Sequence, residues 1–296
     1  MTRPHLILGE ALFDIFPDGT RVLGGAPFNV AWNLHQLHEP ACFVGGIGDD
    51  ANGALIRQRM EAIGMQRRGL YVHPEAPTGQ VRVTLEHGEP SYTILPDQAY
   101  DDVPDSWADN LPDTAAFLYH GTLALRSGNR VLLERLRARA DHRFVDVNLR
   151  APWYAIDDVL ALVRKADVVK LNHEEAAELA PDVPADQRAA TLLERCAIRS
   201  ALIVTHGKDG ATIHTTTGER YQAPAPAVPH LRDAVGAGDA FASVVILGMQ
   251  RGWDWPAILH RALEFAAAVC GLQGATTEDL AFYRRATATW EKPVRK

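Results

Sequence analysis

Two patterns of apolar residues alternate along most of the chain. Short apolar runs, which predict buried strands, occupy residues 5–9, 41–46, 115–120, 144–148, 167–171 and 201–205. Other segments have apolar residues three or four positions apart and predict helices, for example 30–37, 52–63 and 240–252. This alternation predicts an α/β fold in which helices cover both faces of a mostly parallel sheet.

The segment 79–95 departs from this pattern. Residues 80–86 alternate strictly between polar and apolar, and after a turn the chain returns as a second extended run. This pattern predicts a β-hairpin. With the extended segment near 11–26, it predicts a small β-sheet lid made of about 11–26 and 79–100 on a single domain spanning 1–296. An edge hairpin of the main sheet is the alternative, and both a monomer and a homodimer formed through the lid fit the pattern.

Composition excludes several classes of partner. The formal net charge of −7 argues against nucleic acid or an anionic membrane as the main partner. No apolar stretch approaches the roughly 18 residues that a membrane span needs. Cys42, Cys196 and Cys270 are far apart and form no CxxC pair, which predicts reduced cysteines in a cytoplasmic protein. The twelve histidines are scattered and indicate no metal cage.

A glycine-rich turn, Gly236-Ala237-Gly238, opens the most apolar predicted helix, and Asp239 follows it directly. The first backbone N–H groups of a helix lack partners inside the helix, and its dipole adds positive potential, so this turn is a candidate anion site. A carboxylate there repels an anion but can accept a proton from an attacking hydroxyl. Anion site and base together indicate phosphoryl transfer. The alternative is that Asp239 is an ordinary helix cap.

Further polar residues follow predicted strands at the edge where parallel strands end. They are Asp146, Asn148, Arg150, Asn172, Glu175, Thr205 and Gly207. Each has a local alternative, such as a helix cap or a surface ion pair. Because they converge on one edge, we interpret the set as a site.

The N-terminal third offers two more candidates and one misleading motif. Asp14 lies between apolar neighbours in an extended run and either faces solvent or binds ligand hydroxyls, and Asn29 follows two glycines in a first helical turn. Residues 46–51 imitate a dinucleotide-binding fingerprint, which would indicate a nicotinamide oxidoreductase. Asp49 and Asp50 in that turn would repel a pyrophosphate, so we expect a turn and helix cap there instead. No Walker A motif is present.

Two stretches match the signatures of a known family. They are Gly24-Gly25-Ala26-Pro27-Phe28-Asn29-Val30-Ala31 and Asp233-Ala234-Val235-Gly236-Ala237-Gly238-Asp239-Ala240-Phe241. With them, the chain resembles the ribokinase/PfkB carbohydrate kinases over nearly all of its length. The resemblance implies a doubly wound, ribokinase-like α/β fold with a β lid. It also implies ATP-dependent phosphorylation of a sugar hydroxymethyl group with Mg²⁺.

The resemblance also implies roles for the residues at matching positions. Asp239 would be the catalytic base, and the amides of Gly236, Ala237 and Gly238 the anion hole. Residues facing the sugar would be Asp14, Gly25, Asn29 and Arg150. Residues on the nucleotide side would be Asn172, Thr205, Gly207, Gly236 and Gly238. Glu175 would lie near Mg²⁺, through water, and Asp233 near a monovalent cation such as K⁺, although Ala234 stands where many members have Thr.

The segment from Gly9 to Gly19 looks most like that of bacterial fructokinases, which predicts D-fructose as substrate and fructose 6-phosphate as product. Other kinases in the same class remain alternatives, acting on 2-keto-3-deoxygluconate, ribose or a nucleoside, because few contacts set sugar selectivity. A sugar-sensing protein without catalysis is an alternative from another class.

Overall fold

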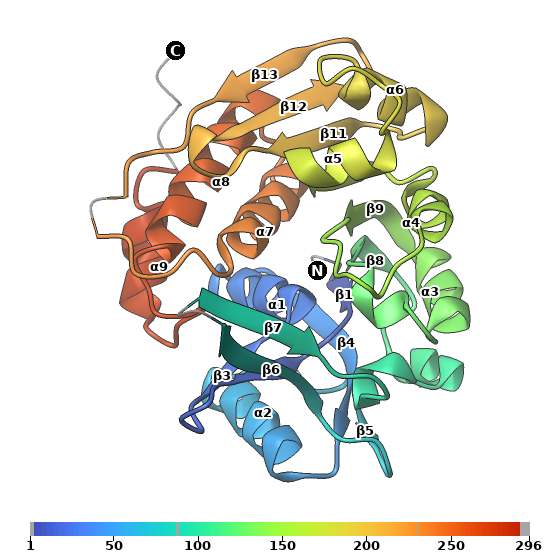
Figure 1. The fold of residues 1–296 in the computed structure, drawn as a ribbon, viewed down its shortest axis with the longest axis vertical. Coiled ribbons are helices and arrows are strands. Elements are labelled where there is room, and N and C mark those ends of the chain that lie inside the picture. The colour runs from blue at the N-terminus through green and yellow to red at the C-terminus, as the bar shows by residue number, and fades with distance from the viewer. Residues whose placement is uncertain (1–2, 87–88, 229, 291–296) are drawn as a thin grey trace.

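In the computed structural model, which describes residues 3–86, 89–228 and 230–290, the main sheet has nine strands within these ranges. Their order is β13-β12-β11-β10-β9-β8-β1-β4-β5 (Figure 1). They are β1 (His5–Leu8), β4 (Ala41–Gly48), β5 (Leu70–His73), β8 (Ala115–His120), β9 (Ala140–Asp146), β10 (Val168–Asn172), β11 (Ala201–Thr205), β12 (Ala211–Thr215) and β13 (Arg220–Ala223). Only the β11–β12 and β12–β13 pairs are antiparallel. The predicted mostly parallel sheet is confirmed.

Helices cover both faces of this sheet (Figure 1). They are α1 (Ala26–Gln36), α2 (Ala51–Ala62), α3 (Arg130–Arg137), α4 (Ile156–Val163), α5 (His173–Leu179), α6 (Arg188–Arg195), α7 (Ala237–Gln250), α8 (Trp255–Val269) and α9 (Leu280–Thr287). The two-residue period of a strand explains the arrangement. In β1, Ile7 belongs to the core cluster that contains α1, α7 and α8, whereas Leu6 and Leu8 belong to the cluster that contains α3.

The order of the strands reverses at β1, the position where open parallel sheets have their ligand crevice. From β1 the chain adds β4 and β5 on one side, and later β8, β9, β10 and β11 on the other. In an open parallel sheet, the carboxyl ends of strands on either side of such a reversal leave room for a ligand. Glu10 follows β1 at this edge, and the loops that follow β8, β9 and β10 begin at the same edge.

A second, four-stranded sheet has the order β3-β2-β6-β7 (Figure 1). It is made of β2 (Leu12–Ile15), β3 (Arg21–Gly24), β6 (Gly79–Glu86) and β7 (Glu89–Ile94). Val81 and Val83 of β6 are buried and Arg82 is exposed, as the alternating pattern predicts. The hairpin therefore belongs to a separate small sheet, and the edge-hairpin alternative is wrong. Residues 87–88 of the predicted turn lie outside the described residues.

One buried arginine joins this small sheet to the main domain. The Arg126 guanidinium pairs with Asp101 at 2.6 Å and donates to the carbonyl of Leu95, just after β7, at 2.7 Å. It also stacks over Trp153, 4.3 Å from the ring centroid. Because the Arg126 side chain is only 3% exposed, these contacts fasten the end of β7 to the loop that follows β8.

The acidic turn before α2 forms a helix cap. Asp50 caps α2 by accepting a hydrogen bond from the Gly53 amide at 2.8 Å, as the acidic turn predicted. Among the described residues, no helix combines the length and apolar character needed to cross a membrane.

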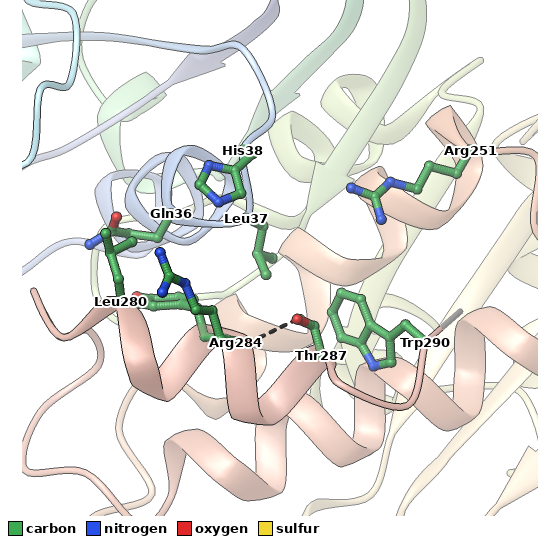
Figure 2. A pocket seen from close by; sticks show the side chains of 9 residues that line it. Gln36, Leu37, His38, Arg251, Leu280, Arg284, Thr287 and Trp290 are labelled. Carbon is green, nitrogen blue, oxygen red and sulfur yellow. Dashed lines mark hydrogen bonds between the residues drawn. The ribbon is translucent and has the colours of Figure 1, made fainter. Parts of the chain in front are cut away.

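A small cavity of about 130 Å³ lies at the carboxyl end of α1. Figure 2 shows His38 beyond that end, Arg251 at the end of α7, and Arg284 on α9. A helix of eleven residues is about 16 Å long, so this cavity is far from the amino end of α1 where the glycine signature lies. His38 and Arg251 lie at the carboxyl ends of α1 and α7, where the helix dipole favours basic side chains. We therefore assign the cavity no function.

Candidate active site

The amino end of α7 is open in the sense that no side chain caps it. Gly236 is its N-cap in a left-handed conformation, with φ of 80°, and a side chain there would overlap Ala275. The Ala237 amide donates to the Ala234 carbonyl at 3.3 Å. The amides of Gly238 and Asp239 have no hydrogen-bond partner within the described part of the chain. Two backbone donors at the positive end of a 14-residue helix are thus free to bind an anion.

Asp239 is held by a residue from the other glycine signature. Nδ2 of Asn29, in the first turn of α1, donates to Oδ2 of Asp239 at 2.8 Å. The pKa of Asp239 is raised to about 6, mainly by burial; the Asn29 hydrogen bond, Lys170 and Arg150 act to lower it, and Asp146 acts to raise it. At neutral pH the carboxylate is therefore mostly ionised but close to its pKa, which suits a general base.

A buried ion pair lies beneath this helix end. Nζ of Lys170, on β10, contacts both carboxylate oxygens of Asp146 on β9, at 2.7 and 2.9 Å. Tyr119 on β8 donates to the same carboxylate at 3.1 Å. A Cβ on Gly238 would lie 3.3 Å from Nζ of Lys170. Burial lowers the pKa of Lys170, but Asp146 outweighs this and the net shift is upward, so the lysine carries its charge directly under the anion site.

The amino end of α5 has a capping box made by its own residues, and we call it the closed helix end. The Asn172 side chain accepts from the Glu175 amide at 2.8 Å, and Oε2 of Glu175 accepts from the Asn172 amide at 2.8 Å. Oε1 of Glu175 accepts from the Leu149 amide at 2.7 Å. Glu175 thus forms a capping box and also fixes the loop that carries Arg150. For Asn172 and Glu175 the sequence analysis gave a helix cap as the local alternative. The two residues form such a cap here.

Residues predicted to face a sugar lie at the small sheet and the crevice. Asp14 on β2 is half-buried, and burial raises its pKa to about 6, while Arg150 lowers it. Arg150 is exposed and also lowers the pKa of Glu10 and of Asp239. The Arg150 charge therefore acts on Asp14, Glu10 and Asp239 alike. Gly25 is the N-cap of α1, with φ of 104°.

The remaining predicted residues lie along the same edge. Thr205 pairs with Asn172 in the register of β10 and β11, and Gly207 begins the short turn after β11. Asp233 precedes the α7 turn, and its carboxylate accepts from the amides of Val235 and Gly274 at 3.0 and 3.3 Å. Beside the crevice, the loops after β8 and β9 enclose a cavity of about 310 Å³ lined in part by Thr122, Arg126 and Trp153.

The sequence prediction assigned no role to three residues that the structure places here: Glu10, Lys170 and Tyr119. Lys170 carried a readable signal, because it is a lone charge inside an apolar strand, and such a charge must be paired when buried. Tyr119 and Glu10 gave no comparable signal. Among the described residues, no group of three or more His, Cys, Asp and Glu could hold a metal ion.

Comparison with known proteins identifies the family of this chain. The sequence model for the pfkB family carbohydrate kinases matches residues 14–280. This chain belongs to that family. A fructokinase of Vibrio alginolyticus is 28% identical over 91% of this chain and 92% of its own. An aminoimidazole riboside kinase of Salmonella typhimurium is also 28% identical, over 92% and 89%. A 5-dehydro-2-deoxygluconokinase of Clostridium perfringens is 27% identical, over 84% and 77%.

Solved structures share the fold. The fructokinase of Xylella fastidiosa with bound ATP has a TM-score of 0.84 at 23% identity, covering 99% of this chain and 100% of that one. A double mutant of the fructokinase of Vibrio cholerae O395, with fructose, ADP and a potassium ion, has a TM-score of 0.78 at 24% identity, covering 95% and 97%. The ribokinase-like fold is thus confirmed, and the protein is a carbohydrate kinase.

Proposed function

We propose that this carbohydrate kinase transfers the γ-phosphate of ATP to a hydroxymethyl group of D-fructose, giving fructose 6-phosphate. One observation carries the proposal: an ionisable carboxylate, Asp239, shares the first turn of α7 with two free backbone amides. This places a proton acceptor beside an anion site, which is what phosphoryl transfer to an alcohol requires. Relatives named fructokinase, and the segment from Gly9 to Gly19, support the choice of sugar.

The reaction needs one proton acceptor. Oδ2 of Asp239 accepts from Asn29, while Oδ1 accepts no hydrogen bond within the described part of the chain. Oδ1 is therefore available to the sugar hydroxyl. As that oxygen attacks the γ-phosphorus, its proton passes to Asp239 and ADP leaves. General-base assistance of this kind is worth about 10²–10⁴ in rate.

The helix end would stabilise the group in transfer. The Gly238 and Asp239 amides donate at the positive end of α7, and Lys170 adds a full charge below them. Removal of one such donor typically costs about 10²–10³ in kcat. Asn172, Thr205 and Gly207 lie along the neighbouring strand ends, where the nucleotide would extend from the transferred phosphate.

Cations would act mainly through the nucleotide. Mg²⁺ usually keeps several waters and binds phosphate oxygens with one or two carboxylates, so the lack of a protein cage within the described residues is compatible with it. When bound, it would neutralise phosphate charge. Glu175 would reach it through water, because both of its oxygens already accept backbone hydrogen bonds. Asp233 is our candidate ligand for K⁺, the ion present in the Vibrio cholerae fructokinase structure described above.

On the sugar side, Asp14, Gly25 and Arg150 border the crevice beneath the small sheet. A carboxylate and a guanidinium can together bind several hydroxyls. We assign the small sheet, made of β2, β3, β6 and β7, the role of a lid that excludes water from the transfer.

ADP release tests the proposal directly. The purified chain would be incubated with ATP, Mg²⁺ and each of fructose, glucose, mannose, ribose, 2-keto-3-deoxygluconate, aminoimidazole riboside and adenosine. We expect the highest kcat/KM with fructose. A preference for another substrate would overturn the sugar assignment but not the chemistry. Sugar binding without ADP release from any substrate would overturn the kinase proposal and favour a sensor.

A further inference from the structure

Glu10 is a buried carboxylate that the proposed chemistry leaves unexplained. It follows β1 at the crevice and is 4% exposed. Oε1 accepts from the Ala26 amide at 3.2 Å, while Oε2 is buried without a partner. An ionisable group buried with one unsatisfied oxygen costs stability, so its presence needs a reason.

The contact of Glu10 with Ala26 replaces a cap that α1 lacks. The N-cap of α1 is Gly25, which has no side chain to accept a first-turn amide. Glu10 supplies that acceptor from another element, and a carboxylate at a helix amino end is also favoured by the dipole. The backbones of Gly25 and Glu10 are also packed closely together, because a Cβ on Gly25 would lie 2.4 Å from the Glu10 carbonyl oxygen.

Glu10 fixes the first turn of α1. That turn carries Asn29, the residue that donates to the candidate base Asp239. Asn29 lies three residues after Ala26, and its Nδ2 donates to Asp239 at 2.8 Å. The other amide atom of Asn29, Oδ1, is buried and has no hydrogen-bond partner. The position of the Asn29 side chain therefore depends on the position of α1. A path of two hydrogen bonds and one helical turn thus joins Glu10 to Asp239.

Glu10 is also coupled to Asp239 by charge. Burial raises the pKa of Glu10 to about 7, and among the smaller contributions Arg150 lowers it and the Asp239 carboxylate raises it. Because Glu10 has the higher pKa, it is mostly protonated where Asp239 titrates, and the coupling makes it harder to ionise Glu10 beside an ionised Asp239. Charged or titratable groups on the other elements around Glu10 are Arg150, Asp239, Tyr100, Tyr119 and Arg126.

We propose that Glu10 is a positioning residue that caps α1 in place of Gly25, holds Asn29 against Asp239, and is electrostatically coupled to that carboxylate. This rests on the proposed function in that Asp239 is taken as the base. Glu10 itself touches no substrate in this scheme, because its free oxygen is buried.

The test separates geometry from charge with two substitutions. Glu10→Gln keeps an oxygen that can accept from Ala26 but removes the charge, whereas Glu10→Ala removes both. Asp254→Asn is the matched control, since Asp254 caps α8 through the Ala257 amide and is exposed outside the crevice. The titration midpoint of Glu10 would be followed by carboxyl ¹³C NMR in wild type and in Asp239→Asn, assigned with Glu10→Gln, and kcat and KM for the sugar would be measured for the two Glu10 variants and the control.

In Asp239→Asn we expect the Glu10 midpoint to move down from about 7 by about half to one pH unit, because a like charge is removed. In Glu10→Gln, which keeps the acceptor, we expect a smaller rise in the sugar KM than in Glu10→Ala. In Glu10→Ala we expect the sugar KM to rise about tenfold as Asn29 loses its support. Asp254→Asn should move neither. A Glu10 midpoint that is the same in wild type and in Asp239→Asn would overturn the proposal, even if Glu10→Ala fails to fold. A shifted NMR midpoint in a protein that turns over no sugar would support the coupling and overturn the proposed function alone.

Discussion

Helices α5 and α7 begin at the same edge of the sheet, and each has an acidic residue at the same position of its first turn. The two acids make different contacts. Glu175 and Asp239 are each the third residue after the N-cap, in α5 and α7 respectively. In α5 the N-cap is Asn172, and the two side chains satisfy each other's backbone amides. In α7 the N-cap is Gly236, no side chain caps the helix, and Asp239 is held by Asn29 of α1 instead.

The difference shows that the residue at the N-cap decides what the acid does. In a capping box the side-chain cap accepts from the amide of the acid, so the acid becomes part of the helix end. A glycine cap leaves the amide of the acid free, as at Asp239, and lets a ligand approach the backbone. We therefore expect α5 to contribute mainly stability at this edge and α7 mainly chemistry. Substitutions at the two acids should separate these contributions.

The largest effect is expected at the open helix end. Asp239→Asn removes the proton acceptor but keeps the shape of the side chain, so kcat should fall about 10²–10⁴-fold. Thermal stability at pH 8 should be equal or higher, because a buried charge is removed. Steady-state kinetics and thermal unfolding measure the two effects.

Asp254→Asn, at the exposed cap of α8, serves as the control and should leave kcat unchanged. Near wild-type turnover by Asp239→Asn would show that Asp239 is not the base.

The closed helix end should respond in stability. In Glu175→Gln, one amide oxygen replaces two carboxylate acceptors, and the new NH₂ faces a backbone donor. We expect the free energy of unfolding to fall by about 2–3 kcal/mol, since each buried hydrogen bond to a charged group contributes about 1.5–3 kcal/mol. Glu174→Gln, at the exposed neighbouring residue, should change it by less than about 0.5 kcal/mol.

Urea denaturation of Glu175→Gln and Glu174→Gln measures this difference. If Glu175→Gln instead lost turnover about a hundredfold with its stability intact, Glu175 would act on the nucleotide and its metal rather than as a cap.

Local patterns along the chain were sufficient to predict much of this edge. The six short apolar runs and the strict alternation of 80–86 each correspond to a strand of the structure. Both hydrogen-bond partners at α5 lie within four residues of each other, so Asn172 and Glu175 could be interpreted as a cap from sequence alone. Asp239 was recognised because glycines and an acid at a helix start are a local signal.

Partners distant in sequence could not be predicted in this way. The Asn29–Asp239 hydrogen bond spans 210 residues, and the Arg126–Asp101 pair and the Lys170–Asp146 pair also join separate elements. Only the strand order brings these residues together. The cap that Glu10 provides for α1 is of the same kind, since Gly25 shows that a cap is missing but not which residue replaces it.

The smallest effect is expected in the pH dependence, where activity and stability should move in opposite directions. Asp239 must be ionised to accept a proton, so kcat/KM should fall about tenfold per unit below its pKa of about 6. The pKa of Asp14 is also about 6. If Asp14 must be ionised to bind the sugar, kcat/KM falls more steeply with decreasing pH. For stability the sign reverses: a raised folded-state pKa means that the folded chain binds more protons than the unfolded chain between about pH 4 and 6. Acidification therefore favours folding through this group.

Comparison of wild type with Asp239→Asn isolates that contribution. The free energy of unfolding of wild type, relative to the variant, should rise by about 1 kcal/mol from pH 8 to pH 5, given about 1.4 kcal/mol per pKa unit. Urea denaturation of both proteins at the two pH values measures it. A relative stability that falls on acidification would mean that the pKa of Asp239 is lowered, as for an ordinary capping carboxylate. The contrast between the open and the closed helix end would then be lost.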